Sequence, residues 1–285
     1  GYARTAEIQE LLNRGWLSAL ELTPARARAI APRVVSVASH LDERPTRVPR
    51  AVFELIRSAL PLGPVLVQVL SEARRAAAEL GKAFPGAAVA FSSADHRLDK
   101  VSAASQLVLA TPGAEPPAEH GYAAAVLLDV DAMLRRGDLR VGEESLRRWL
   151  AAAALVRPGA EQGSVLVVGS TAERAVQTLL KLDVAGFAQR EISDRAEADL
   201  PPAVKMVVIE GSYQALSAVV EEIALPKAAS KLGPLPTEQP DRYRLTLRCP
   251  LASGTEMVSA VRVLSSVRAA RKAEPIRVIV DPHVV

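Results

Sequence analysis

Short apolar runs, separated by segments with the pattern of amphipathic helices, constrain the fold of this chain more than any other feature. The runs have the length of strands and lie at residues 65–69, 87–91, 106–110, 123–130 and 165–168. Continuous apolar strands are typical of a parallel sheet that is buried on both faces. Helices between them supply the crossovers that such a sheet needs. The sequence therefore predicts an α/β unit with a mostly parallel sheet.

The last part of the chain follows a different order. The expected elements are strand 204–210, helix 212–223, a short strand near 231–235, strand 243–248, helix 252–272 and strand 276–280. This βαββαβ order is that of the ferredoxin-like split unit. We therefore predict a second domain of that type.

The length of 285 residues allows two domains, because single cores rarely grow beyond about 250 to 300 residues. We place the α/β domain at 51–200 and the ferredoxin-like domain at 201–285. Residues 1–50 are rich in proline and arginine, which denies them a long helix, and we interpret them as a linker segment.

Residues 122–158 carry a specific resemblance. An apolar strand leads through 126–131 to an acidic pair, then to the step Asp138-Leu139-Arg140, then to Glu143 and an alanine-rich helix. This order resembles the second motor lobe of the PriA family of primosomal replication-restart proteins, actinobacterial in type. The resemblance covers nearly the whole chain. It implies a RecA-like helicase lobe 2 followed by the family's C-terminal domain, so the chain would be the C-terminal portion of a larger protein.

The residues that drive the family's motor are replaced. The corresponding helix in the family ends in Gln-Val-Ala-Gly-Arg-Ala-Gly-Arg. Aligned without gaps, the glutamine falls on Ala151 and the two arginines fall on Leu155 and Pro158, while Arg157 lies one position from the second. Helicases use such arginines to stabilise charge on the transferring phosphoryl group. The resemblance therefore implies a pseudohelicase lobe.

A second motif of the family is changed in the same way. Residues 109–113 occupy the place of the segment that couples ATP to DNA, and Thr111 is kept. Two prolines within 115–118 would stiffen a loop that has to move in an active motor. We expect no ATP-driven unwinding by this chain.

No other catalytic centre is indicated. The phosphate-loop spacing Gly-x-x-x-x-Gly-Lys-Ser/Thr is absent, so we expect no ATP site in this chain. Asp129 and Asp131 superficially resemble a magnesium-holding strand end, but acids at strand ends are common and we interpret them as ordinary. No Gly-x-Ser-x-Gly elbow is present. Cys249 lies in an apolar strand, which favours a buried, inert thiol.

The binding of zinc would require a cysteine-rich segment that this sequence does not contain. Cys249 is the only cysteine and the four histidines are scattered, so we predict no metal and no disulfide in this chain. The resemblance implies a segment with eight cysteines and two zinc ions between 65–69 and the helix at 72–82. Here that insert is absent near 69–71. Either it is lost, or its residues were removed or left out of this sequence, and zinc in the parent protein stays open.

Contact with nucleic acid is the positive signal. Arg242, Arg244 and Arg248 alternate along the strand at 243–248, so they share one face. Four further cations lie on or just after the last helix: Arg262, Arg268, Arg271 and Lys272. Contacts with phosphates and the backbone, without reading of bases, would follow. The alternative is a merely solvated face.

Three functions are open at this stage. The first, implied by the resemblance, is a DNA-binding component of the replication-restart primosome that recognises branched DNA at stalled forks and helps to reload the replication machinery. The second is an ATP-dependent 3'-5' DNA helicase whose nucleotide site lies in the missing first lobe. The third is a protein-interaction scaffold without DNA affinity, which would use apolar side chains around Trp16 and Trp149.

The expected partners and location follow from the first hypothesis. The partners would be branched or single-stranded DNA, other replication-restart proteins and single-strand-binding proteins. No apolar run approaches the ~18 residues of a membrane span, so we expect no membrane partner and a cytoplasmic, nucleoid-associated location. The sequence does not indicate an oligomeric state.

Overall fold

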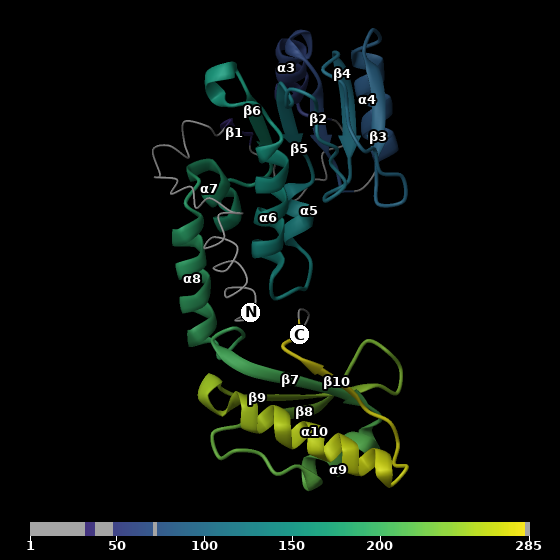
Figure 1. Cartoon of the computed structure of the whole chain (residues 1–285), viewed down its shortest axis with the longest axis vertical. Coiled ribbons are helices and arrows are strands. Elements are labelled where there is room, and N and C mark those ends of the chain that lie inside the picture. Colours follow the sequence, from purple (N-terminus) through teal and green to yellow (C-terminus); the bar gives the residue numbers. More distant parts are fainter. Residues whose placement is uncertain (1–31, 38–47, 71–72, 283–285) are drawn as a thin grey trace, which may run out of the picture. The chain divides into compact units, whose positions relative to one another are not determined.

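The computed structural model describes residues 32–37, 48–70 and 73–282, and these form two compact units (Figure 1). Unit 1 takes the described residues up to Leu134 together with Glu144–Leu182. Unit 2 takes Arg135–Glu143 and the described residues from Asp183 onward. The nine residues 135–143 therefore cluster with unit 2, although both of their chain neighbours belong to unit 1.

Unit 1 is built on a six-stranded sheet in which every neighbouring pair of strands is parallel. Its order is β1-β6-β5-β2-β4-β3. The strands are β1 Arg33–Val37, β2 Val65–Gln68, β3 Ala88–Ser92, β4 Gln106–Ala110, β5 Ala124–Leu127 and β6 Ser164–Val168. The predicted parallel α/β fold is confirmed. Strand β1 lies within segment 1–50, where we predicted no strand.

Helices connect these strands and cover the sheet. They are α3 Arg50–Ala59, α4 Ala73–Ala83, α5 Val130–Leu134, α6 Val141–Ala154 and α7 Arg174–Lys181. Ile56 of α3 and Leu80 of α4 pack on the face that holds Val67 and Val126. Leu66, which points to the other face, is fully buried as well. Burial on both faces explains why the strands are apolar without alternation.

Unit 2 contains the expected βαββαβ order. After α8 Val184–Glu197 come β7 Val204–Gly211, α9 Tyr213–Glu222, β8 Ser230–Pro236, β9 Tyr243–Pro250, α10 Gly254–Ala270 and β10 Arg277–Val280. The four strands form a sheet in the order β10-β7-β9-β8, and all pairs are antiparallel. The ferredoxin-like domain predicted from the sequence is confirmed.

The two faces of this sheet differ in chemistry. Helices α9 and α10 lie along one face (Figure 1), where Leu216, Met257 and Val261 pack against Leu245 and Leu247 of β9. Residues of the opposite parity point away from these helices. Among them, the register sets Glu210 of β7 directly between Arg277 of β10 and Arg244 of β9.

Edge strand β8 is interrupted opposite Arg244. Its register shifts between Leu232 and Leu235, which marks a bulge. Gly233 adopts a φ of 102°, and a Cβ there would lie 2.5 Å from the carbonyl oxygen of Arg244. Only glycine fits this approach. Leu232 and Leu235 are left 56% and 51% exposed.

Candidate functional site

The carboxyl edge of the parallel sheet is the first place to look for a site, because ligands bind there in open α/β sheets. Strand β2 ends there with Gln68, and the loop 111–118 leaves the sheet at the end of β4. Gln68 is fully buried, and its Nε2 donates to Glu115 Oε1 at 2.5 Å. The Glu115 carboxylate in turn accepts the backbone N–H of Gly113 at 2.9 and 3.0 Å.

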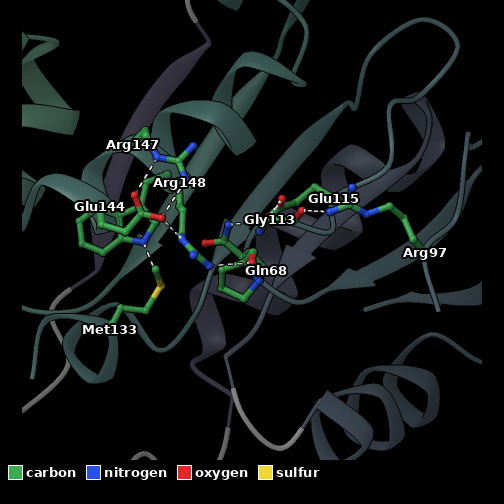
Figure 2. A network of polar contacts seen from close by, with 10 residues as sticks. Gln68, Arg97, Gly113, Glu115, Met133, Glu144, Arg147 and Arg148 are labelled. Carbon is green, nitrogen blue, oxygen red and sulfur yellow. Dashed lines mark hydrogen bonds and ion pairs between the residues drawn. The ribbon is translucent and has the colours of Figure 1, made fainter. Parts of the chain in front are cut away.

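Loop 111–118 is held by several further side chains (Figure 2). Arg148 of α6 donates to the Pro112 carbonyl at 2.9 Å, and Arg97 donates to the Gly113 carbonyl. Ser92 Oγ donates to the Ala114 carbonyl at 2.6 Å. The hydroxyl of Tyr122 donates to the Pro116 carbonyl at 2.8 Å, and burial raises the pKa of this tyrosine. The loop is therefore tied to β2, β3 and α6 by hydrogen bonds.

An acid on α6 organises the arginine that holds this loop. Glu144 accepts from Arg148 Nε at 2.7 Å and from Arg147 at 2.7 and 2.8 Å (Figure 2). Hydrogen bonding to Arg147, together with that to Arg148, lowers the pKa of Glu144 to about 2, against an opposing contribution from burial. One turn further along α6, Trp149 is fully buried and donates to Met133 Sδ at 3.4 Å.

Asp129 and Asp131 both bind backbone N–H groups at this edge. Asp129 Oδ2 accepts from Leu70 at 3.0 Å, and Asp131 Oδ1 accepts from Ser170 at 2.8 Å. The two acids thereby join the loop after β5 to the loops after β2 and β6. In the part of the chain that the structure describes, no three His, Cys, Asp or Glu side chains are grouped as metal ligands.

Arg157 lies at the opposite, amino-terminal edge of the sheet. Its guanidinium donates to the Leu62 carbonyl, just before β2, at 2.9 Å and to the His120 carbonyl, just before β5, at 3.0 Å. Its backbone N–H donates to the Tyr122 carbonyl. A Cβ at Gly163, which precedes β6, would lie 1.8 Å from the Arg157 carbonyl oxygen. Arg157 thus fastens the two segments that lead into β2 and β5, and the backbone at Gly163 passes close to it.

The other motif positions surround Arg157 in sequence and carry no charge. Ala151 is exposed on α6, Leu155 is half-buried after it, and Pro158 precedes the turn at Gly159. Thr111 is half-buried and its backbone N–H donates to the Ser92 carbonyl. Arg157 points to the edge opposite the one where parallel sheets bind ligands. The expectation that these positions have lost the family's motor chemistry stays a prediction.

The predicted strand arginines lie together in unit 2, on the sheet face opposite α9 and α10. Glu210 Oε1 binds Arg244 Nη2 at 3.2 Å, and its Oε2 lies 3.6 Å from Arg242 Nη2 and 3.7 Å from Arg277 Nη1. Arg248 lies further along β9, where it donates to Ser230 Oγ at 3.3 Å. We call Arg242, Arg244, Arg248 and Arg277 the arginine face.

Two residues of this cluster, Arg277 and Glu210, were not predicted from the sequence. Arg277 is the first residue of β10 and lies between Ile276 and Val278, which pack against the core, so this local pattern could have placed it on the opposite face of the strand. Glu210 could not have been assigned to this cluster from the sequence, because the local residue pattern does not show that β7 pairs with β9. The apolar residues Met206 and Val208 share the face but are buried.

The predicted helix cations lie on the other side of the sheet. Arg262, Arg271 and Lys272 are exposed on α10 or directly after it. Arg268 is only 6% exposed, pairs with Glu222 at 3.8 Å and donates to the Glu274 carbonyl. The seven cations expected to act together therefore form two separate groups, and Arg268 is withdrawn from solvent.

A buried arginine organises the start of unit 2. Arg195 of α8 is 5% exposed and pairs with Glu143 at 2.6 Å and with Glu191 at 3.4 Å. It also donates to the carbonyls of Leu139 and Pro201. The segment that contains the Asp138-Leu139-Arg140 step is therefore fastened to α8 and to the turn that leads into β7.

Comparison with known proteins bears on both units. Residues 196–283 match the family of the primosomal protein N C-terminal domain, PriA_C. The chain is 33% identical to the probable replication restart protein PriA of Mycobacterium leprae over an alignment of 364 positions, which covers 99% of this chain and 56% of that protein. The protein of the same name from Mycobacterium tuberculosis H37Rv is also 33% identical, over 99% of this chain and 57% of its own length.

The chain belongs to the PriA family. It spans a little over half the length of the PriA relatives it matches. The aligned stretch has 364 positions against 285 residues here, so at least 79 positions have no counterpart in this chain. We expected the zinc insert to be missing near residues 69–71, and of these residues Ser71 lies outside the described ones.

The expectation that this chain holds no metal stays a prediction. Cys249 is buried and burial raises the pKa of its thiol, which disfavours a metal-binding thiolate. The scaffold hypothesis needs exposed apolar side chains around Trp16 and Trp149, but Trp149 is fully buried in the core. Trp16 lies outside the described residues.

No helix in the described ranges has the length and apolar character of a membrane span.

Proposed function

We propose that this chain is the DNA-binding, C-terminal part of a replication-restart protein. It recognises branched DNA at stalled forks and helps to reload the replication machinery, without hydrolysing ATP itself. Membership of the PriA family supports the process, and the arginine face supports the contact with DNA. The first sequence hypothesis is thus retained as our proposal.

The single observation that carries the proposal is the composition of the arginine face. Four arginines share this face of the unit 2 sheet, and one acid, Glu210, lies among them. Guanidinium groups bind phosphate with two parallel hydrogen bonds, which suits them to a nucleic-acid backbone. Phosphate contacts fix orientation without reading sequence, so branched DNA would be recognised by the path of its backbone.

The state of the motor positions supports a role without ATP hydrolysis. Arg157 is engaged with two carbonyls at the amino-terminal edge of the unit 1 sheet. Loop 111–118, which matches the coupling segment of active relatives, is hydrogen-bonded on several sides. Unit 1 would therefore serve as a structural part of the replication-restart primosome and not as a motor. The partners we propose are branched or single-stranded DNA, other restart proteins and single-strand-binding proteins.

The direct test compares two sets of substitutions that remove the same charge. Fluorescence anisotropy would measure binding of a labelled three-way fork, a plain duplex and a single strand. We expect Arg242→Gln/Arg244→Gln/Arg248→Gln to weaken fork binding by about tenfold or more, because each lost phosphate contact weakens binding. Glutamine avoids placing new acids beside Glu210.

The matched control removes three charges from the other side of the sheet. Arg262→Gln/Arg271→Gln/Lys272→Gln should stay within about twofold of the unchanged chain. Thermal melting would show that both variants are folded. Equal losses in the two variants would contradict an interface on the arginine face. No binding to any DNA at low salt would favour the scaffold hypothesis.

A further inference from the structure

Glu210 is placed unusually for an acid on a face that binds phosphate. It is directly opposite Arg277 on one side and Arg244 on the other, and Arg242 approaches it diagonally. The Glu210 side chain is 14% exposed, whereas those of Arg244, Arg242 and Arg277 are 31%, 41% and 68% exposed. The acid therefore lies beneath three arginines whose side chains reach solvent.

The contacts around Glu210 are long. Charge-assisted hydrogen bonds between guanidinium and carboxylate groups are typically about 2.7 to 2.9 Å. Here the three distances are 3.2, 3.6 and 3.7 Å. Glu144 of unit 1, by contrast, binds its two arginines at 2.7 Å. Glu210 is thus shared by three partners, and it leaves most of their N–H groups available for a second anion.

A carboxylate and a phosphate compete for the same donors. Each guanidinium has five N–H groups in a planar fork that suits either anion. Glu210 keeps the three heads close together, because separating them would leave its own charge without partners. It also reduces the local charge from +3 to +2, and it repels a phosphate that approaches the heads.

We propose that Glu210 is an internal counter-ion that limits the affinity of the arginine face for the phosphate groups of DNA. This rests on the proposed function. When DNA binds, Arg242 and Arg277 turn their free N–H groups to phosphates while Glu210 remains beneath them. Because phosphate contacts carry no sequence information, Glu210 lowers the affinity for fork and duplex by the same factor.

The test is the isosteric substitution Glu210→Gln, measured by anisotropy with the labelled fork and the plain duplex. We expect binding of both DNAs to tighten by about five- to tenfold, because one repulsive charge is removed while its shape is kept. Glu222→Gln is the matched control, since Glu222 also lies between two arginines, Arg268 and Arg271, but on the helix side. It should leave binding unchanged.

A second variant separates charge from geometry and does not depend on the first one folding well. Glu210→Asp keeps the negative charge but shortens the side chain, so its DNA affinity should stay near that of the unchanged chain. Tighter binding by Glu210→Asp, or unchanged or weaker binding by a folded Glu210→Gln, would overturn the role of Glu210 while leaving DNA binding intact. Failure of the unchanged chain to bind DNA would overturn the proposed function, and this inference with it.

Discussion

At the scale of single residues, Arg157 has a structural role near positions that we expect, from the family resemblance, to be changed motor positions. In a helicase an arginine near this position would act on a phosphoryl group, but here its guanidinium donates to the carbonyls of Leu62 and His120. Hydrogen bonds to charged groups contribute about 1.5 to 3 kcal/mol each, and partial exposure reduces this. Arg157 is thus expected to stabilise unit 1 rather than to take part in catalysis.

This role predicts a loss of stability for Arg157→Ala. We expect the free energy of unfolding to fall by about 2 kcal/mol, because two backbone carbonyls lose a charged donor. Urea denaturation followed by the fluorescence of Trp149, in a Trp16→Phe background, would measure it. Arg50→Ala is the control, since its exposed pair with Glu54 contributes about 0.5 kcal/mol or less. Equal stability of the two variants would contradict the assignment.

A second residue-scale prediction concerns Glu144. Its pKa is about 2 in the folded chain, below its ordinary value near 4.3, chiefly because Arg147 and Arg148 hydrogen-bond to the charged form. A depressed pKa stabilises the fold above the unfolded value, and this contribution disappears as pH falls towards about 2. Because the side chain is 36% exposed, screening limits it to ~1 kcal/mol or less.

The measurement for Glu144 compares the unchanged chain with Glu144→Gln in urea between pH 6 and pH 3. The difference in unfolding free energy should be largest above about pH 5 and should shrink steadily at lower pH. A difference that is the same at every pH would show that the charge of Glu144 does not contribute in this way.

At the scale of elements, loop 111–118 is the part of unit 1 that we expect from the sequence to be stiffened. Two of its three prolines were visible in the sequence as a source of stiffness, and that expectation stays a prediction. The hydrogen bonds from Gln68, Ser92 and Arg148 could not be foreseen, because these donors are 47, 22 and 36 residues from their acceptors and reach the loop only through the strand order β5-β2-β4-β3.

Hydrogen exchange would measure how firmly this loop is held. Gly113 should exchange slowly in the unchanged chain, because its N–H donates to Glu115. Glu115→Ala should raise its exchange rate by about tenfold or more, which corresponds to ~1.4 kcal/mol. Lys100→Ala, which breaks only the exposed pair with Glu119, is the control. Exchange as fast as in a free peptide without any substitution would show that the loop is mobile.

At the scale of the whole molecule, the sequence predicts architecture better than it predicts surfaces. Apolar runs identify strands β2, β4, β5 and β6, because burial on both faces leaves a local pattern. Strand β1 is missed because its five residues lie in a proline-rich stretch. The arginine face is only half visible, since Arg242, Arg244 and Arg248 alternate within one strand, whereas Glu210 and Arg277 join them through pairing with distant strands.

At the same scale, we propose different tasks for the two units. Unit 1 has a parallel sheet, and Ala151, Leu155 and Pro158, which we expect to be changed motor positions, carry no charge. Unit 2 presents the arginine face. We therefore propose, as the central claim, that this chain binds DNA through phosphate contacts made by unit 2.

The dependence of fork binding on salt tests this claim most directly. For each phosphate contact, the slope of log K against log salt becomes steeper by about 0.9 on duplex DNA. We predict a steep slope for the unchanged chain. For Arg242→Gln/Arg244→Gln/Arg248→Gln, the loss of two to three phosphate contacts should make the slope shallower by ~2 to 3. The same slope in both proteins would contradict the claim, and it would assign DNA binding to another part of the chain.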